Sequence, residues 1–216
     1  LTSPTWGYGV TLWPLGAGWS ATHLWQHFQF TKDKQWLRSQ GYPVMKEYAL
    51  FLADYLVADP ITGKLMSGPS SSPENAFVYD SINRKQAKAC MGPAVDHQII
   101  TELFRSCIEA AKILQTDDAF AKRLQQKLDS IASQQIGQDG RLPEWNKEYA
   151  EAEKGHRHTS HLWGIYPGTI FTQQATPELF AAARKSLDVR VAHGMTDVEW
   201  SSAYTINYYA RFKEAD

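Results

Sequence analysis

The sequence is short of the features that mark several classes of protein. Two cysteines in 216 residues, Cys90 and Cys107, are too few for a disulfide framework and lack the spacing of a metal-binding motif. No apolar run approaches the roughly 20 residues that cross a bilayer. The 22 Lys and Arg residues against 23 Asp and Glu give a net charge of −1, with no excess for the basic face that a nucleic-acid binder needs. The composition predicts neither a membrane partner nor a nucleic-acid partner.

Several sequence signatures are missing as well. The chain has no Gly-rich phosphate loop, no Gly-x-Ser-x-Gly elbow for a serine nucleophile, and no parallel-strand pattern. It begins at Leu1 without a basic-then-apolar leader and stops at Asp216 directly after an amphipathic pattern. We therefore expect a piece of a longer protein. Aromatic residues, in contrast, are plentiful, with eight Trp and ten Tyr. They fill a core or line a cleft that stacks on flat apolar faces, such as those of sugars.

Helical spacing of apolar residues runs through most of the chain. Asp33 and Thr176 are predicted helix caps, the second followed by Pro177 in the first turn. Cys107 falls on an apolar helical pattern and is predicted to be buried. The predicted helices cover residues 19–28, 33–37, 44–57, 93–114, 117–135, 176–191 and 200–212. Within 44–57, the predicted apolar face consists of Val44, Tyr48, Phe51, Leu52, Tyr55 and Leu56.

Two long segments, 59–89 and 137–166, interrupt the helices and are predicted to be loops, the first with short extended pieces. Helices joined by alternately short and long connections are typical of an α/α toroid or a helical bundle. In a toroid the long loops gather at one mouth, where a ligand binds. We predict an all-α fold that is an incomplete part of an (α/α)6 toroid, with a single domain over residues 1–216.

Both loops hold candidate functional residues. Glu74, within Ser70-Ser71-Ser72-Pro73-Glu74-Asn75, is a loop carboxylate suited to general acid catalysis, and the alternative is a solvated side chain. The run Gly155-His156-Arg157-His158-Thr159-Ser160-His161 suits binding of a hydroxylated ligand. A metal site and a structural network of buried histidines are its alternatives. Glu144 lies beside Trp145 and is a third candidate, although most of the acids at 144–153 are expected on a solvated face.

Six ordered motifs resemble the catalytic helical barrel of glycoside hydrolase family 95, the inverting α-L-fucosidases and their α-L-galactosidase relatives. They span nearly the whole chain, at residues 13–25, 69–75, 96–100, 140–145, 155–168 and 199–201. The resemblance implies that Glu74 is the general acid and that Arg157 and His158 bind the sugar. Trp13 and Trp19 are the candidate aromatic walls of the pocket. The family resemblance implies no cofactor and no metal, and a secreted or periplasmic location.

The motifs that supply the catalytic base side of the site in that family are missing from this sequence. The family carries an upstream Asn-x-Asn motif and a downstream His-Pro-Pro-Phe-Gln-Ile-Asp-Gly-Asn-Phe-Gly segment, and neither occurs between Leu1 and Asp216. Asp96 and Asp197 match neither. His97 stands where the family often has an apolar residue.

Three functions follow as hypotheses. The leading one is an α-L-fucosidase fragment acting on fucosylated oligosaccharides or glycans by single displacement, inactive in isolation because the basic side is missing. The alternatives are an α-L-galactosidase and a non-catalytic helical carbohydrate-binding or scaffold piece. Keeping Glu74 together with Arg157 and His158 favours an enzyme, because a scaffold needs none of them.

Overall fold

The computed structural model describes residues 13–214, and this part of the chain is mostly helical, as the sequence predicted. Within it the chain forms two compact units. The helical unit consists of residues 14–68 and 96–132, and the mixed unit of Trp13, 69–95 and 133–214. None of the described helices is both long and apolar enough to cross a membrane.

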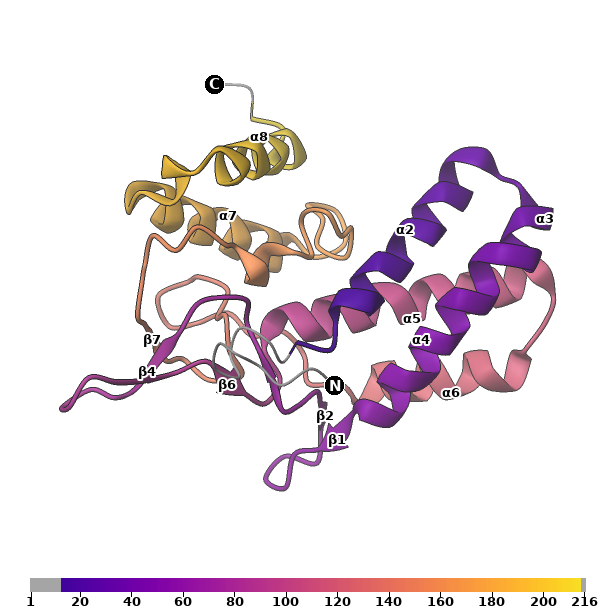
Figure 1. Cartoon of the computed structure of the whole chain (residues 1–216), viewed down its shortest axis with the longest axis horizontal. Coiled ribbons are helices and arrows are strands. Elements are labelled where there is room, and N and C mark those ends of the chain that lie inside the picture. Colours follow the sequence, from indigo (N-terminus) through magenta and orange to yellow (C-terminus); the bar gives the residue numbers. More distant parts are fainter. Residues whose placement is uncertain (1–12, 215–216) are drawn as a thin grey trace, which may run out of the picture. The chain divides into compact units, whose positions relative to one another are not determined.

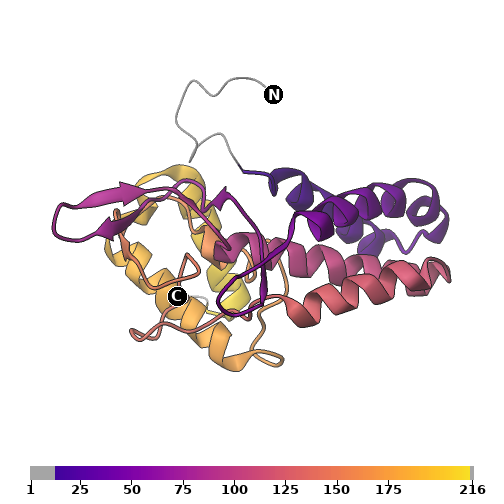
Figure 2. The ribbon, with the colours of Figure 1, turned by 90° about the horizontal axis from the view of Figure 1, so that it is seen from below.

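Four long helices of the helical unit lie side by side (Figures 1 and 2). A short helix and one π-helical turn connect the first two, and Asp33 caps the short helix by accepting bonds from two backbone amides, as predicted. The unit also contains a small two-stranded sheet, β1 with β2. The elements of the helical unit are α2 (Gly16–Thr31), α3 (Lys34–Trp36), the π-helix Leu37–Gly41, α4 (Tyr42–Tyr55), β1 (Val57–Ala58), β2 (Leu65–Met66), α5 (Ala94–Leu114, from Asp96 on) and α6 (Asp118–Ser130).

The buried face of α4 agrees only in part with the predicted one. Leu52 is buried as predicted, but Met45 and Ala49 are buried where Val44 and Phe51 were expected, and those two are 45% and 48% exposed. Helices that approach closely need small side chains at the contact. A Cβ built on Gly18 of α2 lies only 3.1 Å from Leu52. Phe51 therefore stands on the outer side of α4, whereas Tyr42 at its start is buried.

Helix α6 ends at Ser130, five residues before the predicted end. Ile131 turns to an extended conformation and forms a bridge with Leu65, and the backbone amide of Ala132 donates to the carbonyl of Leu65 at 3.1 Å. This pairing beside β2 replaces the last predicted turn of helix. Cys107 is fully buried, as predicted.

The mixed unit combines small antiparallel sheets with two helices. Strand β3 pairs with β6, and β4 lies between β5 and β7. Its elements are β3 (Ser70–Ser71), β4 (Phe77–Asp80), β5 (Lys85–Ala87), β6 (Ala89–Cys90), β7 (Ala150–Glu151), the 3-10 helices Ser160–Leu162 and Met195–Asp197, α7 (Pro177–Ala192) and α8 (Glu199–Phe212). The predicted loop 59–89 thus holds the expected short extended pieces.

An apolar core joins α7 and α8 to the loop that precedes them. Leu187 of α7 and Tyr208 of α8 are buried in it together with Leu162 and Ile165. The prediction that Thr176 caps α7 with its side chain was wrong, because that hydroxyl bonds to the backbone of Thr172 instead. The core holds α8 beside residues 155–161, the histidine-rich segment.

Candidate active site

Glu74 occupies the short loop between β3 and β4, and both ends of that loop are tied down. On one side, Ser70 and Ser71 pair with β6. On the other, the amide of Ala152 donates to the carbonyl of Ala76 at 2.9 Å. The Glu74 side chain is 33% exposed. A fixed backbone with a partly open carboxyl group is what a proton donor to a bound ligand requires.

Arg157 and His158 meet Glu74 across this loop. A guanidinium nitrogen of Arg157 donates to Oε2 of Glu74 in a close ion pair. Nε2 of His158 lies 3.5 Å from the same oxygen. Ser160 also donates to the carbonyl of Pro73. The structure therefore brings together the three polar residues that the resemblance pointed to, although Arg157 lies 83 residues after Glu74 in the sequence.

Helix α8 holds the histidine-rich segment in place. Ser201 donates to the carbonyl of Arg157 at 2.8 Å, and the hydroxyl groups of Thr159 and Tyr208 lie 2.8 Å apart. The ring of Trp200 packs on His158 with 4.5 Å between ring centroids. Ser201 and Tyr208 are buried, so these contacts fix the segment from its inner side.

Burial favours the neutral form of the histidines in this segment. Burial lowers the pKa of His156 to about 3, and nearby arginines add to that effect. Burial also lowers the pKa of His158, opposed by Glu74. The amide of His158 donates to Nδ1 of His156 at 3.1 Å, so His156 carries its proton on Nε2. Neutral imidazoles both donate and accept hydrogen bonds, which matches the hydroxyl groups of a sugar.

A cavity of about 340 Å³ opens beside Glu74 and Arg157. Gln86 of β5 and Lys88 line another part of its wall, together with His156. Its wall is therefore mostly polar and carries directed donors. A cavity of this volume is in the range of small-molecule sites.

Glu144 is buried beneath the Glu74 loop and is 4% exposed. Its Oε1 accepts from Ser72 at 2.7 Å, and its Oε2 accepts from Asn75 at 3.1 Å and from Arg190 at 2.6 Å. Burial raises the pKa of the Glu144 carboxyl, and Arg190 counteracts this. Removing one partner of a buried ion pair typically costs about 3–5 kcal/mol, because the other charge is left uncompensated.

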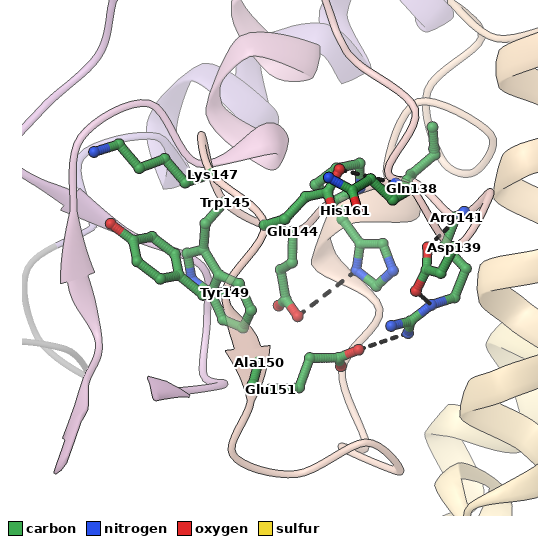
Figure 3. A pocket seen from close by; sticks show the side chains of 13 residues that line it. Gln138, Asp139, Arg141, Glu144, Trp145, Lys147, Tyr149, Ala150, Glu151 and His161 are labelled. Carbon is green, nitrogen blue, oxygen red and sulfur yellow. Dashed lines mark hydrogen bonds and ion pairs between the residues drawn. The ribbon is translucent and has the colours of Figure 1, made fainter. Parts of the chain in front are cut away.

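The buried pair continues into a chain of alternating charges, of which Figure 3 shows Glu151, Arg141 and Asp139. Arg190 lies 2.6 Å from Glu151, Arg141 lies 2.6 Å from Glu151, and Arg141 also bonds to Asp139 at 2.6 Å. A cavity of about 240 Å³ lies alongside, with the Glu144 carboxylate and the His161 ring pointing toward one another. The expectation of a solvated face holds for Glu148 and Glu153, which are exposed, and was wrong for Glu151, whose side chain is 10% exposed. Glu144, which the sequence set apart as a candidate, is buried.

The predicted aromatic walls, Trp13 and Trp19, are both partly buried, and Trp19 belongs to α2 in the helical unit. Their part in binding stays a prediction. Trp200, which is 39% exposed, is the aromatic ring that stands beside His158. Trp200 lies in the motif at 199–201, but no local pattern marks its ring as part of the site, and sequence reasoning gave it no role for that reason.

The described residues contain no group of three or more His, Cys, Asp and Glu side chains arranged to hold a metal ion. Burial lowers the pKa of His161 well below its usual value. The His161 ring faces the Glu144 carboxylate, whose negative charge Arg190 already balances. The histidine-rich run is thus divided between a buried part, at His156 and His161, and a part that faces Glu74, at His158.

Comparison with known families decides which class of protein this is. The sequence model of the "Glycosyl hydrolase family 95 catalytic domain" matches residues 1–216. The chain belongs to glycosyl hydrolase family 95. Within that family it is similar to Alpha-L-fucosidase 2 of Arabidopsis thaliana, at 33% identity over the whole chain and 25% of that protein. It is also similar to the Probable alpha-fucosidase A of Aspergillus niger, at 30% identity over 74% of the chain and 20% of that protein.

This family 95 chain therefore spans about a quarter of the length of its Arabidopsis relative. The Probable alpha-fucosidase A of Aspergillus oryzae matches over a similar share, at 26% identity over 72% of the chain. The family model covers both structural units, so both belong to the catalytic domain of a family 95 protein.

Proposed function

We propose that the protein containing this chain hydrolyses terminal α-L-fucosyl linkages of oligosaccharides or glycans with inversion, and that Glu74 is its general acid. The observation that carries the proposal is the meeting of Glu74, Arg157 and His158, of which Glu74 and Arg157 line a polar cavity. The names of the relatives at about 30% identity support fucose as the sugar. The resemblance further supports a complete (α/α)6 ring in the whole protein and a secreted or periplasmic location.

The mechanism assigns Glu74 the proton that the leaving oxygen receives. A general acid donates its proton as the bond to the leaving group breaks. Hydroxyl groups of the bound sugar engage Arg157 and His158, while the carboxyl group of Glu74 faces the leaving oxygen. Water attacks the opposite face of the sugar, activated by a group about 6.5–9.5 Å from Glu74. The resemblance assigns that group to sequence beyond these 216 residues.

The test of this proposal is the configuration of the first product. The whole protein, incubated with an α-L-fucosyl oligosaccharide, is expected to release β-L-fucose before mutarotation, because a single displacement inverts the anomeric centre. Proton NMR recorded during the first minutes distinguishes the two anomers. Release of α-L-fucose first, or release of L-galactose alone from matched α-L-galactosides, contradicts the proposal.

If the histidine-rich segment binds sugar and not a metal ion, the hydrolysis rate does not depend on chelators. Extended treatment of the whole protein with EDTA is expected to leave the hydrolysis rate unchanged. His158→Ala is expected to lower kcat/KM about tenfold, the scale of one hydrogen bond to a substrate hydroxyl. His193→Ala is the matched control, because that ring is exposed and lies 2.7 Å from a carbonyl of its own helix. Loss of activity with EDTA, and its return with zinc, overturns this assignment.

A further inference from the structure

The carboxylate of Glu144 contacts both neighbours of the segment Pro73-Glu74. Ser72 precedes this segment and Asn75 follows it, and each donates from its side chain to one oxygen of Glu144. Ser72 and Asn75 are themselves buried, at 0% and 1% exposure. The side chain of Asn75 also accepts from the amide of Ala76 at 2.9 Å. The backbone on both sides of Pro73-Glu74 is thus fixed by hydrogen bonds from Ser72 and Asn75 to the same buried carboxylate.

Arg190 ties this carboxylate to the opposite wall of the site. Besides its bond to Glu144, it donates to the carbonyls of Glu153 and Lys154 at 2.9 Å and 3.1 Å. Those two residues lead directly into the segment that carries Arg157 and His158. One buried guanidinium therefore holds the loop of the acid, through Glu144, and the start of the sugar-binding segment, through backbone carbonyls.

Stability alone gives a weak reason for such an arrangement. A buried ion pair carries a large desolvation cost, and well-packed apolar side chains of similar volume are often as stable. Directional bonds, in contrast, fix positions to within a fraction of an ångström when every partner is satisfied. Here the bonds of Glu144 fix the loop of Glu74, and those of Arg190 fix the chain that leads to Arg157 and His158.

We propose that the buried pair Glu144–Arg190 is a positioning device that sets the carboxyl group of Glu74 relative to Arg157 and His158. This inference rests on the proposed function, since it assigns Glu144 and Arg190 no contact with substrate. Glu144 acts through Ser72 and Asn75, and Arg190 through the carbonyls at 153 and 154.

The test is the substitution Glu144→Gln in the whole protein. The glutamine side chain keeps the shape of the glutamate but replaces one of its two acceptor oxygens with an amide NH2, so either Ser72 or the pair Asn75 and Arg190 loses its acceptor. We expect kcat on α-L-fucosyl oligosaccharides to fall on the order of 10–100-fold, the scale of a displacement near 1 Å, with KM changed much less. Aryl fucosides with good leaving groups need little protonation and are expected to lose far less.

Two further variants complete the experiment. Glu148→Gln is the matched control, because Glu148 is an exposed carboxylate in the same loop that accepts from the amide of Gln138; it is expected to behave like the parent. Ser72→Ala removes a single anchor and decides the matter if the Glu144 variant does not fold. A loss of equal size on oligosaccharides and on activated aryl fucosides, or no loss in either variant, overturns the positioning role while leaving the assignment of Glu74 intact. A parent protein that releases no fucose overturns the proposed function itself.

Discussion

Glu74→Gln in the whole protein is expected to slow hydrolysis of fucosyl oligosaccharides by about 10²–10⁴-fold, the usual contribution of a positioned general acid. A sugar alkoxide is a poor leaving group, so bond cleavage depends on the proton that Glu74 delivers. Glutamine keeps the size of the side chain and still accepts a hydrogen bond from Arg157, but it has no acidic proton to transfer. We therefore expect the loss in kcat, measured from initial rates of fucose release, with a much smaller change in KM.

Glu178→Gln serves as the matched control for this substitution. Glu178 is an exposed carboxylate in the first turn of α7, in the same unit as Glu74. Its replacement is expected to leave the rate unchanged, which separates a specific effect from a general loss of negative charge. A Glu74 variant that retains the parent rate on oligosaccharides contradicts the assignment of the acid.

Residues 1–216 expressed alone are expected to show no turnover above background. Inversion needs a group that activates water across the sugar from Glu74, and the motifs that carry it in family 95 do not occur in this sequence. An acid without a positioned nucleophile loses the benefit of proximity. The isolated chain also exposes large apolar side chains, among them Phe30 and Ile82 at 91% and Ile61 at 85%, and is expected to self-associate.

Light scattering and an assay of fucose release on the same sample check this expectation. The whole protein at equal molarity is the control for the assay. A stable monomer of 216 residues with turnover comparable to the whole protein shows that the basic side has been misplaced and lies within this chain.

The helices were predictable because local signals decide them. Asp33 accepts two amide bonds at the start of α3, as its position suggested, and apolar spacing located α2, α5 and α8. Where tertiary contacts compete, local signals failed. Leu52 of α4 packs closely against Gly18 of α2, and this packing leaves Val44 and Phe51 exposed, while pairing with Leu65 ends α6 early.

The candidate site was predictable in part, for a similar reason. Glu74, Arg157 and His158 lie in motifs that the resemblance identified, and the structure brings them together. Glu144 was a candidate from the sequence, but its pairing with Arg190 was missed, since Arg190 looks like an ordinary surface charge in sequence. One signal was available: Arg190 falls three residues after Leu187, on the face of α7 that Ala183 and Leu187 bury. A charge in such a stripe indicates a buried partner.

The central claim is that Glu74 protonates the leaving group, and the dependence of rate on leaving-group acidity tests it most directly. The parent and the Glu74→Gln variant are compared on a series of aryl α-L-fucosides, from dinitrophenyl to unsubstituted phenyl. We predict a shallow dependence of kcat/KM in the parent, because the acid compensates for poor leaving groups, and a steep dependence in the variant, with rates converging at the most acidic phenols. Equal slopes for the two proteins, with a uniform loss across the series, would contradict the role of Glu74 as general acid.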